Sequence, residues 1–284
     1  MKVFAPSKIN LYLKIVGKRD DGYHFLDTLM VPISLGDDVE LLWANADDPP
    51  LTLMTEGVEV PDGPENLVYR AAQLFLEQIE GQVPRPLVIR LFKRIPVGAG
   101  LGGGSSDAAA TLLGLNALTG AGFSEKRIMS LALRLGADVP FFVSGTAARA
   151  RGIGEQLSRV GPLPKLWIVL LYPNFEVSTS WVYRNLRFNL TNSSSDNNLF
   201  ENLGTPAKVA RVLLNDLETV TIGRYSDIVR LKERLIEAGA LGSLMSGSGS
   251  SVFGIFATQH AARKACAMLG GYQDTRAYLV SSLT

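Results

Sequence analysis

The part of the chain best suited to chemistry is a glycine-rich stretch at residues 98–104, in which five of seven residues are glycine. Glycine adopts positive φ without a side-chain clash, so such a stretch can turn successive N–H groups toward one anion. Residues 108–115 follow with apolar side chains at helical spacing. We expect Ser105, Ser106 or Asp107 to cap the first turn of that helix. A glycine loop that leads into the positive end of a helix dipole predicts a phosphate-binding site.

Two familiar phosphate loops do not fit this stretch. A P-loop carries a Lys-Ser/Thr pair after its last glycine, whereas two serines follow Gly104. The spacing of a dinucleotide-binding loop is matched only loosely, and no clear acidic residue stands about 20 residues later. An ordinary turn is the alternative, but a turn needs one or two glycines. The length of the run and the helix after it favour phosphate binding.

A lysine and an asparagine stand two residues apart at Lys8 and Asn10, where they alternate with the apolar Ile9 and Leu11. This spacing places both polar side chains on one face of a strand. Alternation alone favours a face exposed to solvent, although a face that lines a cleft is the open alternative.

A carboxylate at Asp138 also has two interpretations. It follows Gly136, which is expected to end a helix, and it precedes Val139 and Pro140. One interpretation is a helix N-cap followed by an early proline. The other is a functional carboxylate, and the local pattern does not choose between them.

Aromatic residues and a second glycine loop complete the candidates. Tyr23 and His24 lie in a loop rich in glycine and aspartate, where a lone histidine is more often a surface or capping residue. Trp181 and Tyr183 each fit a plain core role. The Ser/Gly segment at residues 246–249 is a second glycine loop before a strand, and by itself it fits an ordinary turn.

Taken in order, these motifs resemble those of the GHMP kinases. The glycine stretch, with the proline before it and the serines after it, is similar to their ATP-phosphate loop. Other segments resemble the branch that acts on a cytidine diphosphate alcohol in non-mevalonate isoprenoid precursor synthesis; they lie at residues 6–11, 22–30, 66–72, 136–142, 215–218 and 245–251. Each segment alone is weakly specific, but the ordered set from residue 6 to about residue 257 is highly specific.

The resemblance implies an α+β, two-domain GHMP kinase fold. The N-terminal domain is expected to be like part of a ribosomal small-subunit protein, the C-terminal domain to be ferredoxin-like, and the active site to lie between them. We expect the N-terminal domain, with the ATP phosphate loop, over residues 1–161 and the C-terminal domain over residues 162–284. Prolines and a glycine at residues 161–164 punctuate the chain there.

The resemblance also implies an activity, the ATP-dependent phosphorylation of the 2-hydroxyl of the cytidine diphosphate alcohol. Asp138 is then the catalytic base, and Lys8 is its charge partner, which reverses the solvent-face interpretation. The implied ATP-binding residues are Pro96, Val97, Gly98, Ala99, Gly100, Leu101, Gly102, Gly103, Gly104, Ser105 and Ser106. Mg²⁺ is expected with ATP, held largely by phosphate oxygens and water, with Ser106 only a candidate protein ligand.

The implied substrate-binding residues are Asn10, Tyr23, His24, Thr179 and Tyr183. The Tyr-His pair would bind the cytosine, and Thr179 would contact the substrate phosphate. Tyr183 would form the opposite wall, although Trp181 could replace it. Asn66 is expected near the adenine or as a simple helix cap.

Two other functions compete with this hypothesis. One is another GHMP small-molecule kinase, acting on a mevalonate-like or homoserine-like alcohol; such an enzyme gives no reason for the Tyr-His pair and a second aromatic wall. The other is a non-catalytic nucleotide-binding module on the same scaffold, which would tolerate the loss of Lys8 or Asp138.

Both strands and helices must position these residues. We expect strands at residues 9–15, 39–42, 87–92, 166–171, 252–256 and 276–280. Helices are expected at residues 66–79, 125–135, 228–238 and 259–269. The polar tract at residues 191–198 is predicted to be a loop.

Bulk composition fits an enzyme with a full core. Of 284 residues, 46% are hydrophobic, and 28 Lys+Arg against 27 Asp+Glu leave a net charge of +1, so no global field favours nucleic acid or a membrane. The single Cys266 excludes an intrachain disulfide and is expected in the core. No stretch reaches the ~20 apolar residues of a membrane span, so a cytoplasmic location is expected. The oligomeric state is not readable from the sequence.

Overall fold

The structure, a computed structural model, describes residues 1–284 except residues 80–84, 187–198, 273 and 284. It divides into two compact units that interleave along the chain: unit 1 holds residues 1–7, 35–97 and 102–145, and unit 2 holds residues 8–34, 98–101 and 146–284. The loop expected at residues 191–198 lies outside the described residues. The domain boundary expected at residue 161 stays a prediction.

Two long strands run through both units, β1 (Lys2–Lys18) and β2 (His24–Trp43). The alternating segments at residues 9–15 and 39–42 are therefore confirmed as strands, although each is part of a longer element. The glycine-rich loop also changes unit, because residues 98–101 belong to unit 2 while the residues on both sides of it belong to unit 1.

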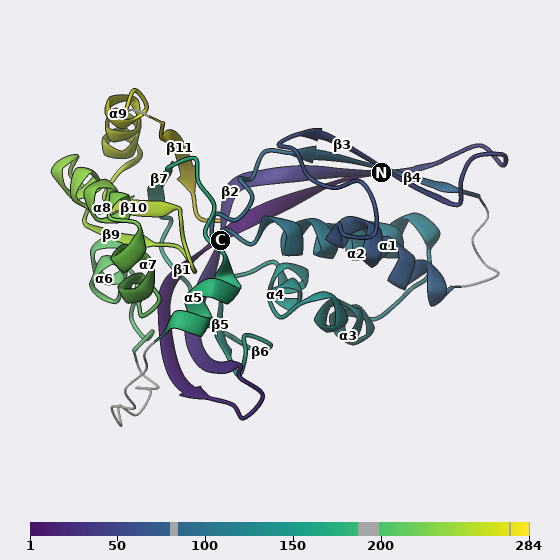
Figure 1. The fold of residues 1–284 in the computed structure, drawn as a ribbon, viewed down its shortest axis with the longest axis horizontal. Helices are drawn as coiled ribbons and strands as arrows, with labels where there is room; N and C mark the ends of the chain where they lie inside the picture. The colour runs from purple at the N-terminus through teal and green to yellow at the C-terminus, as the bar shows by residue number, and fades with distance from the viewer. Residues whose placement is uncertain (80–84, 187–198, 273, 284) are drawn as a thin grey trace. The chain divides into compact units, whose positions relative to one another are not determined.

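The sheet of unit 1 pairs the second part of β2 with β4 (Leu87–Lys93), which is antiparallel to it, and β4 with β3 (Leu51–Gly57), which is parallel. Four helices pack against one another beside these strands (Figure 1), and they are α1 (Leu67–Glu77), α2 (Gly103–Thr119), α3 (Glu125–Leu135) and α4 (Val139–Ser144). Most of the first ten residues of α2 are buried, so this helix forms the centre of the layer.

Local signals explain the helix boundaries in unit 1. The side chain of Asn66 caps α1 by accepting a hydrogen bond from the N–H of Val68 at 2.9 Å, which confirms its capping role. Ser124 caps α3, and Gly136 follows its last residue, as the sequence predicts for residues 125–135.

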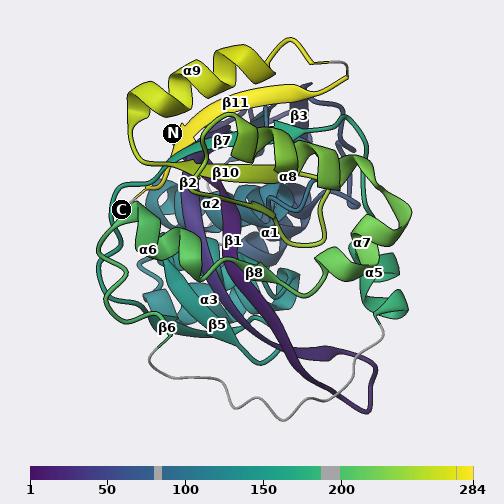
Figure 2. The same ribbon diagram turned by 90° about the vertical axis from the view of Figure 1, so that its left-hand side faces the viewer.

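The main sheet of unit 2 has the strand order β11-β7-β10-β9, with antiparallel neighbours throughout. Its strands are β7 (Trp167–Tyr172), β9 (Gly242–Met245), β10 (Val252–Phe256) and β11 (Arg276–Ser281). Figure 2 shows α8 (Asp227–Glu237) and α9 (Gln259–Leu269) beside these strands. With one helix before β9 and one before β11, this order is the split β-α-β arrangement of the expected ferredoxin-like domain.

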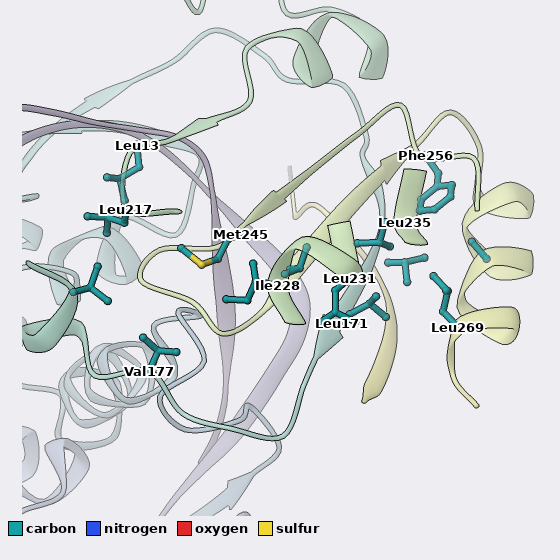
Figure 3. Packing of buried hydrophobic residues seen from close by; sticks show 14 of the residues in the cluster. Leu13, Leu171, Val177, Leu217, Ile228, Leu231, Leu235, Met245, Phe256 and Leu269 are labelled. Atoms are coloured by element: carbon teal, nitrogen blue, oxygen red, sulfur yellow. The ribbon is translucent and has the colours of Figure 1, made fainter. Parts of the chain in front are cut away.

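The core of unit 2 fills the space between that sheet and the two helices (Figure 3). Leu171 from the sheet meets Leu231 and Leu235 of α8 and Leu269 of α9 within one buried cluster. These positions recur at the spacing of an amphipathic helix, which is why the helices were predictable. Cys266, expected in the core, is half-buried and packs against this cluster.

The remaining elements of unit 2 include strands that pair with the parts of β1 and β2 within residues 8–34. Strand β5 (Ala148–Arg151) pairs antiparallel with β2 and with β6 (Gln156–Arg159), and β8 (Leu214–Asn215) pairs parallel with β1. Three short helices also belong to unit 2: α5 (Thr179–Asn185) and α6 (Pro206–Arg211) lie between β7 and β8 in the chain, and α7 (Glu218–Arg224) lies between β8 and α8. Among the described residues, no helix is long and apolar enough to cross a membrane.

Candidate active site

The N-terminus of α2 is open to an anion. Gly102 is the N-cap residue with φ of 70°, a left-handed conformation that favours glycine, and no side chain caps the helix. The expected cap from Ser105, Ser106 or Asp107 was wrong, because the helix begins earlier, at Gly103, and these residues lie within its first turns. The Oγ of Ser106 is buried and has no protein partner. The first N–H groups of this helix therefore have no capping side chain, as a phosphate site requires.

A buried ionic cluster within unit 1 contacts the first turns of α2 through Asp107. The ammonium group of Lys93 contacts Asp37 and lies 3.0 Å from a carboxylate oxygen of Asp107, and all three residues are buried. Asp37 also accepts a hydrogen bond from the N–H of Ile95 at 2.8 Å. This cluster fixes the strand end before the glycine loop to the helix after it.

The cluster also changes the acidity of Asp107. The pKa of this carboxyl is raised to about 8, chiefly by burial, with Lys93 opposing the shift and Asp37 adding to it. The sequence analysis missed the cluster. Lysine and aspartate separated by dozens of residues give no local signal, and Asp107 was considered only as a cap.

In unit 2, the loop segment at residues 98–101 is held by the second glycine loop. The carbonyl oxygen of Gly100 accepts hydrogen bonds from the ammonium group of Lys8 at 3.1 Å and from the hydroxyl of Ser246 at 2.9 Å. A Cβ atom at Gly100 would lie 2.0 Å from the carbonyl oxygen of Ser246, so the close approach requires glycine. The N–H of Ser251 adds a bond to the carbonyl of Ala99 at 3.2 Å.

Asn215 holds the second glycine loop in turn. Its amide donates to the carbonyl oxygens of Met245 at 2.9 Å and Gly247 at 2.7 Å. The segment at residues 215–218 was noted for its resemblance only, and the structure gives its first residue a physical role. Residues 98–101 and the second glycine loop are thus joined by hydrogen bonds within unit 2.

Lys8 and Asn10 share one face of β1, as predicted, but that face is not exposed to solvent. Their exposed fractions are 5% and 3%. The Lys8 ammonium donates to the side-chain oxygen of Asn10 at 2.6 Å, and the Asn10 amide donates to the hydroxyl of Thr28 at 2.9 Å. The interpretation from alternation alone was wrong because Thr28 and Gly100, distant in sequence, cover this face.

Asp138 stands at the beginning of α4 in unit 1, and α4 packs against α2. Its side chain makes no capping hydrogen bond, although it occupies the N-cap position before Pro140. The structure therefore gives no hydrogen bond in support of the capping interpretation. The Asp138 carboxylate is half-buried, and its oxygens are not used in capping α4.

The Tyr23–His24 pair in unit 2 combines an exposed and a buried ring. Tyr23 is 62% exposed, whereas His24 is 6% exposed and its Nδ1 atom has no hydrogen-bond partner. The ring of His24 lies against that of Tyr183, with centroids 5.5 Å apart. Burial, with the charge of Lys18 second, lowers the pKa of His24 and so favours its neutral form. A neutral imidazole with a free ring nitrogen suits recognition of a polar base edge.

Trp181 has different ring neighbours from Tyr183. Its ring meets Tyr225 edge-on at 6.3 Å, and the guanidinium group of Arg224 lies over it. Thr179, the first residue of α5, has its hydroxyl 2.9 Å from the hydroxyl of Ser248 in the second glycine loop. Within unit 2, hydrogen bonds join Thr179 to the second glycine loop, that loop to Gly100, and Gly100 to Lys8 and through it to Asn10 on β1. Asp138 and the start of α2 belong to unit 1.

A protein-built metal centre is absent from the described part of the chain, where no three His, Cys, Asp or Glu side chains could hold an ion together.

Comparison with known proteins identifies the class of protein to which this chain belongs. The family model for the GHMP kinases N terminal domain matches residues 66–146, and the model for the GHMP kinases C terminal matches residues 197–272. A solved homoserine kinase from Cytophaga hutchinsonii is 21% identical, covers 100% of this chain and 94% of its own with a TM-score of 0.71, and so shows the fold alone. The open helix after the glycine loop and the split β-α-β unit are thus parts of a GHMP kinase fold.

Relatives with higher sequence identity define the family within the GHMP kinases. A 4-diphosphocytidyl-2-C-methyl-D-erythritol kinase from Citrifermentans bemidjiense is 46% identical over 94% of this chain and 93% of its own. One from Geobacter metallireducens is 47% identical over 95% and 94%. A solved 4-(cytidine 5'-diphospho)-2C-methyl-D-erythritol kinase is 38% identical with a TM-score of 0.81 over 100% of both chains. The chain belongs to the family of the 4-diphosphocytidyl-2-C-methyl-D-erythritol kinases.

Proposed function

We propose that this chain transfers the γ-phosphoryl group of ATP to the 2-hydroxyl of 4-diphosphocytidyl-2-C-methyl-D-erythritol, a step of non-mevalonate isoprenoid precursor synthesis. The observation that carries the proposal is the near-full-length similarity to kinases of that name, at 46% identity for one of them. The buried Lys8, the uncapped Asp138 and the open end of α2 supply the parts that such a kinase needs.

The chemical step is assigned to Asp138 and Lys8. Asp138 accepts the proton of the substrate hydroxyl as its oxygen attacks phosphorus, and the bond from phosphorus to the leaving oxygen of ADP breaks. Lys8 is proposed as the charge partner of Asp138, and its positive charge balances charge on the phosphoryl group in transfer. The hydrogen bonds of Lys8 to Asn10 and Gly100 support this role, because they hold the ammonium group in one place.

ATP is assigned to the glycine loop, Pro96 to Ser106. The uncapped N–H groups at the start of α2 and the unpartnered hydroxyl of Ser106 fit phosphate oxygens. Mg²⁺ is proposed to accompany ATP, bound mainly by phosphate oxygens and water, since the described residues offer no carboxylate cluster. When bound, the ion would neutralise phosphate charge.

The cytosine is assigned to Tyr23, His24 and Tyr183, and the substrate phosphate to Thr179. The exposed ring of Tyr23 can stack on a base, and the free Nδ1 of His24 can bond to the polar edge of that base. Asn10 is proposed to contact the sugar alcohol. The cytoplasmic location and the absence of a nucleic-acid partner stay predictions.

The test is a coupled assay of ADP release by the purified chain, with the cytidine diphosphate alcohol, mevalonate and homoserine as separate acceptors. We expect turnover with the cytidine compound alone. Good use of mevalonate or homoserine would favour another GHMP small-molecule kinase, and nucleotide binding without turnover of any acceptor would favour a binding module.

A further inference from the structure

A chain of three buried hydrogen bonds leads from a backbone carbonyl to the ammonium group of Lys8. Thr28 donates its hydroxyl proton to the carbonyl oxygen of Tyr12 at 2.6 Å. The amide of Asn10 donates to the hydroxyl oxygen of Thr28 at 2.9 Å, and the ammonium of Lys8 donates to the amide oxygen of Asn10 at 2.6 Å. Thr28 is 2% exposed and lies on β2, so water does not compete at its hydroxyl.

The direction of each bond follows from the first one. A carbonyl oxygen can only accept, and a hydroxyl has one proton, so Thr28 must give that proton to Tyr12. Its oxygen can then only accept from Asn10, which commits the NH₂ end of the amide to Thr28. The oxygen end of the amide is thereby turned toward Lys8.

The opposite orientation of the amide is excluded by charge. Oxygen and NH₂ ends of an asparagine have almost the same shape, so packing does not distinguish them. A reversed amide would place its NH₂ group against the Lys8 ammonium, donor against donor, and its oxygen against a hydroxyl whose proton is already used. Such unpaired buried groups cost more than a normal hydrogen bond gains.

The fold holds Thr28 firmly in this position. It pairs with Ala150 of β5 in the antiparallel ladder, and the preceding residue, Asp27, forms a buried ion pair with Arg149 of the same strand. The backbone at Thr28 is thus fixed on one side by β5, while its hydroxyl reaches β1 on the other.

We propose that Thr28 is a positioning residue, which fixes the ammonium group of Lys8 through the amide of Asn10. This proposal rests on the role of Lys8 in the proposed phosphoryl transfer. Thr28 itself contacts neither substrate nor ATP in this scheme. Its effect is on transition-state geometry, where a displacement of about 1 Å can cost about 100-fold in rate.

The test compares Thr28→Val, which has the same shape without the hydroxyl, with Thr28→Ser, which keeps it. We expect kcat to fall about 10- to 100-fold in the valine variant, with the KM for ATP little changed. The serine variant should recover kcat to within about threefold of wild type. Thr28→Val in a Lys8→Met background should add little further loss, because both changes remove the same interaction.

Thr111→Val is the matched control. Thr111 is also fully buried and donates its hydroxyl to a backbone carbonyl, that of Asp107, at 2.8 Å, but it has no connection to Lys8. If Thr28 had only a structural role, both valine variants would lower the melting temperature to a similar degree and leave kcat unchanged. That result would overturn the proposal.

A readout without turnover separates this proposal from the proposed function. Side-chain amide signals of Asn10 in NMR spectra of the selectively labelled protein should shift in Thr28→Val and stay in place in Thr28→Ser. If wild type phosphorylates none of the acceptors, the proposed function fails, yet these signals still report on the chain of bonds. Unchanged Asn10 signals in Thr28→Val would contradict the positioning role whatever the activity.

Discussion

The imidazole ring of His24 packs against the phenol ring of Tyr183, with centroids 5.5 Å apart and planes inclined by 30°. This contact joins the hairpin that carries the Tyr23–His24 pair to helix α5. It also distinguishes two aromatic candidates by their ring neighbours, because Trp181 meets Tyr225 and not His24, although both Trp181 and Tyr183 pack against the core cluster of unit 2. Tyr183 is therefore the aromatic side chain beside the proposed base site.

Tyr183→Ala should weaken binding of the cytidine substrate more than binding of ATP. Loss of one aromatic face costs ~1–3 kcal/mol per base, or about 5- to 150-fold in KM. Trp181→Ala should instead lower the melting temperature, because it removes core packing, and leave that KM nearly unchanged. Steady-state kinetics with both substrates check this, and the reverse pattern would assign the wall to Trp181.

Asp138→Asn should lower kcat by ~10²–10⁴-fold, the usual contribution of a general base. The fold should persist, because the Asp138 side chain makes no capping hydrogen bond that the amide would lose. ATP affinity from calorimetry and the melting temperature should stay close to wild type. Asp227→Asn, at an exposed position on α8, is the control and should retain full activity. Near wild-type turnover in Asp138→Asn would remove this residue from the mechanism.

Gly104→Val should raise the KM for ATP by at least about tenfold without loss of stability. A Cβ atom at Gly104 would meet only Leu67, at an ordinary contact distance of 3.6 Å, so the protein itself has room for it. Any loss of affinity then reports on the bound phosphate. Gly223→Val, at an exposed glycine of α7 with nothing near its Cβ position, controls for the change in helix backbone. Equal ATP affinity in both variants would show that phosphate does not approach Gly104.

Asp107→Asn should change how stability depends on pH. The folded-state pKa of about 8 lies above the ordinary value of 3.8, so the contribution of Asp107 is fully present below about pH 4 and is lost as pH rises toward 8. Relative to the asparagine variant, wild type should lose up to about 1.4 kcal/mol of unfolding free energy per pH unit in that range. Urea unfolding at several pH values measures this difference.

The exposed Asp62 provides the control for that series, since Asp62→Asn should follow wild type at every pH. A constant difference between wild type and Asp107→Asn across the range would mean that Asp107 does not keep its proton in the folded protein. The ion pair with Lys93 would then dominate over burial.

Elements with a strong local signal were predictable. The helix at residues 125–135 has Ser124 as its cap and Gly136 after its last turn, and both signals act within a few residues of the boundary. The same holds for the helix at residues 259–269 and the strand at residues 252–256. The start of α2 was misplaced because the left-handed Gly102 begins the helix before the serines that looked like caps.

The sequence by itself determined the elements with a strong local signal and, through the ordered motifs, the kinase family. Local periodicity, caps and glycine runs depend on neighbours along the chain, so they can be predicted without knowledge of the tertiary structure. Only the tertiary structure decided that Lys8 is buried, that Thr28 orients Asn10, and that Lys93 joins Asp37 to Asp107. Each of these depends on side chains brought together from separate strands, loops and helices, where burial and hydrogen-bond direction are set by packing and not by sequence spacing.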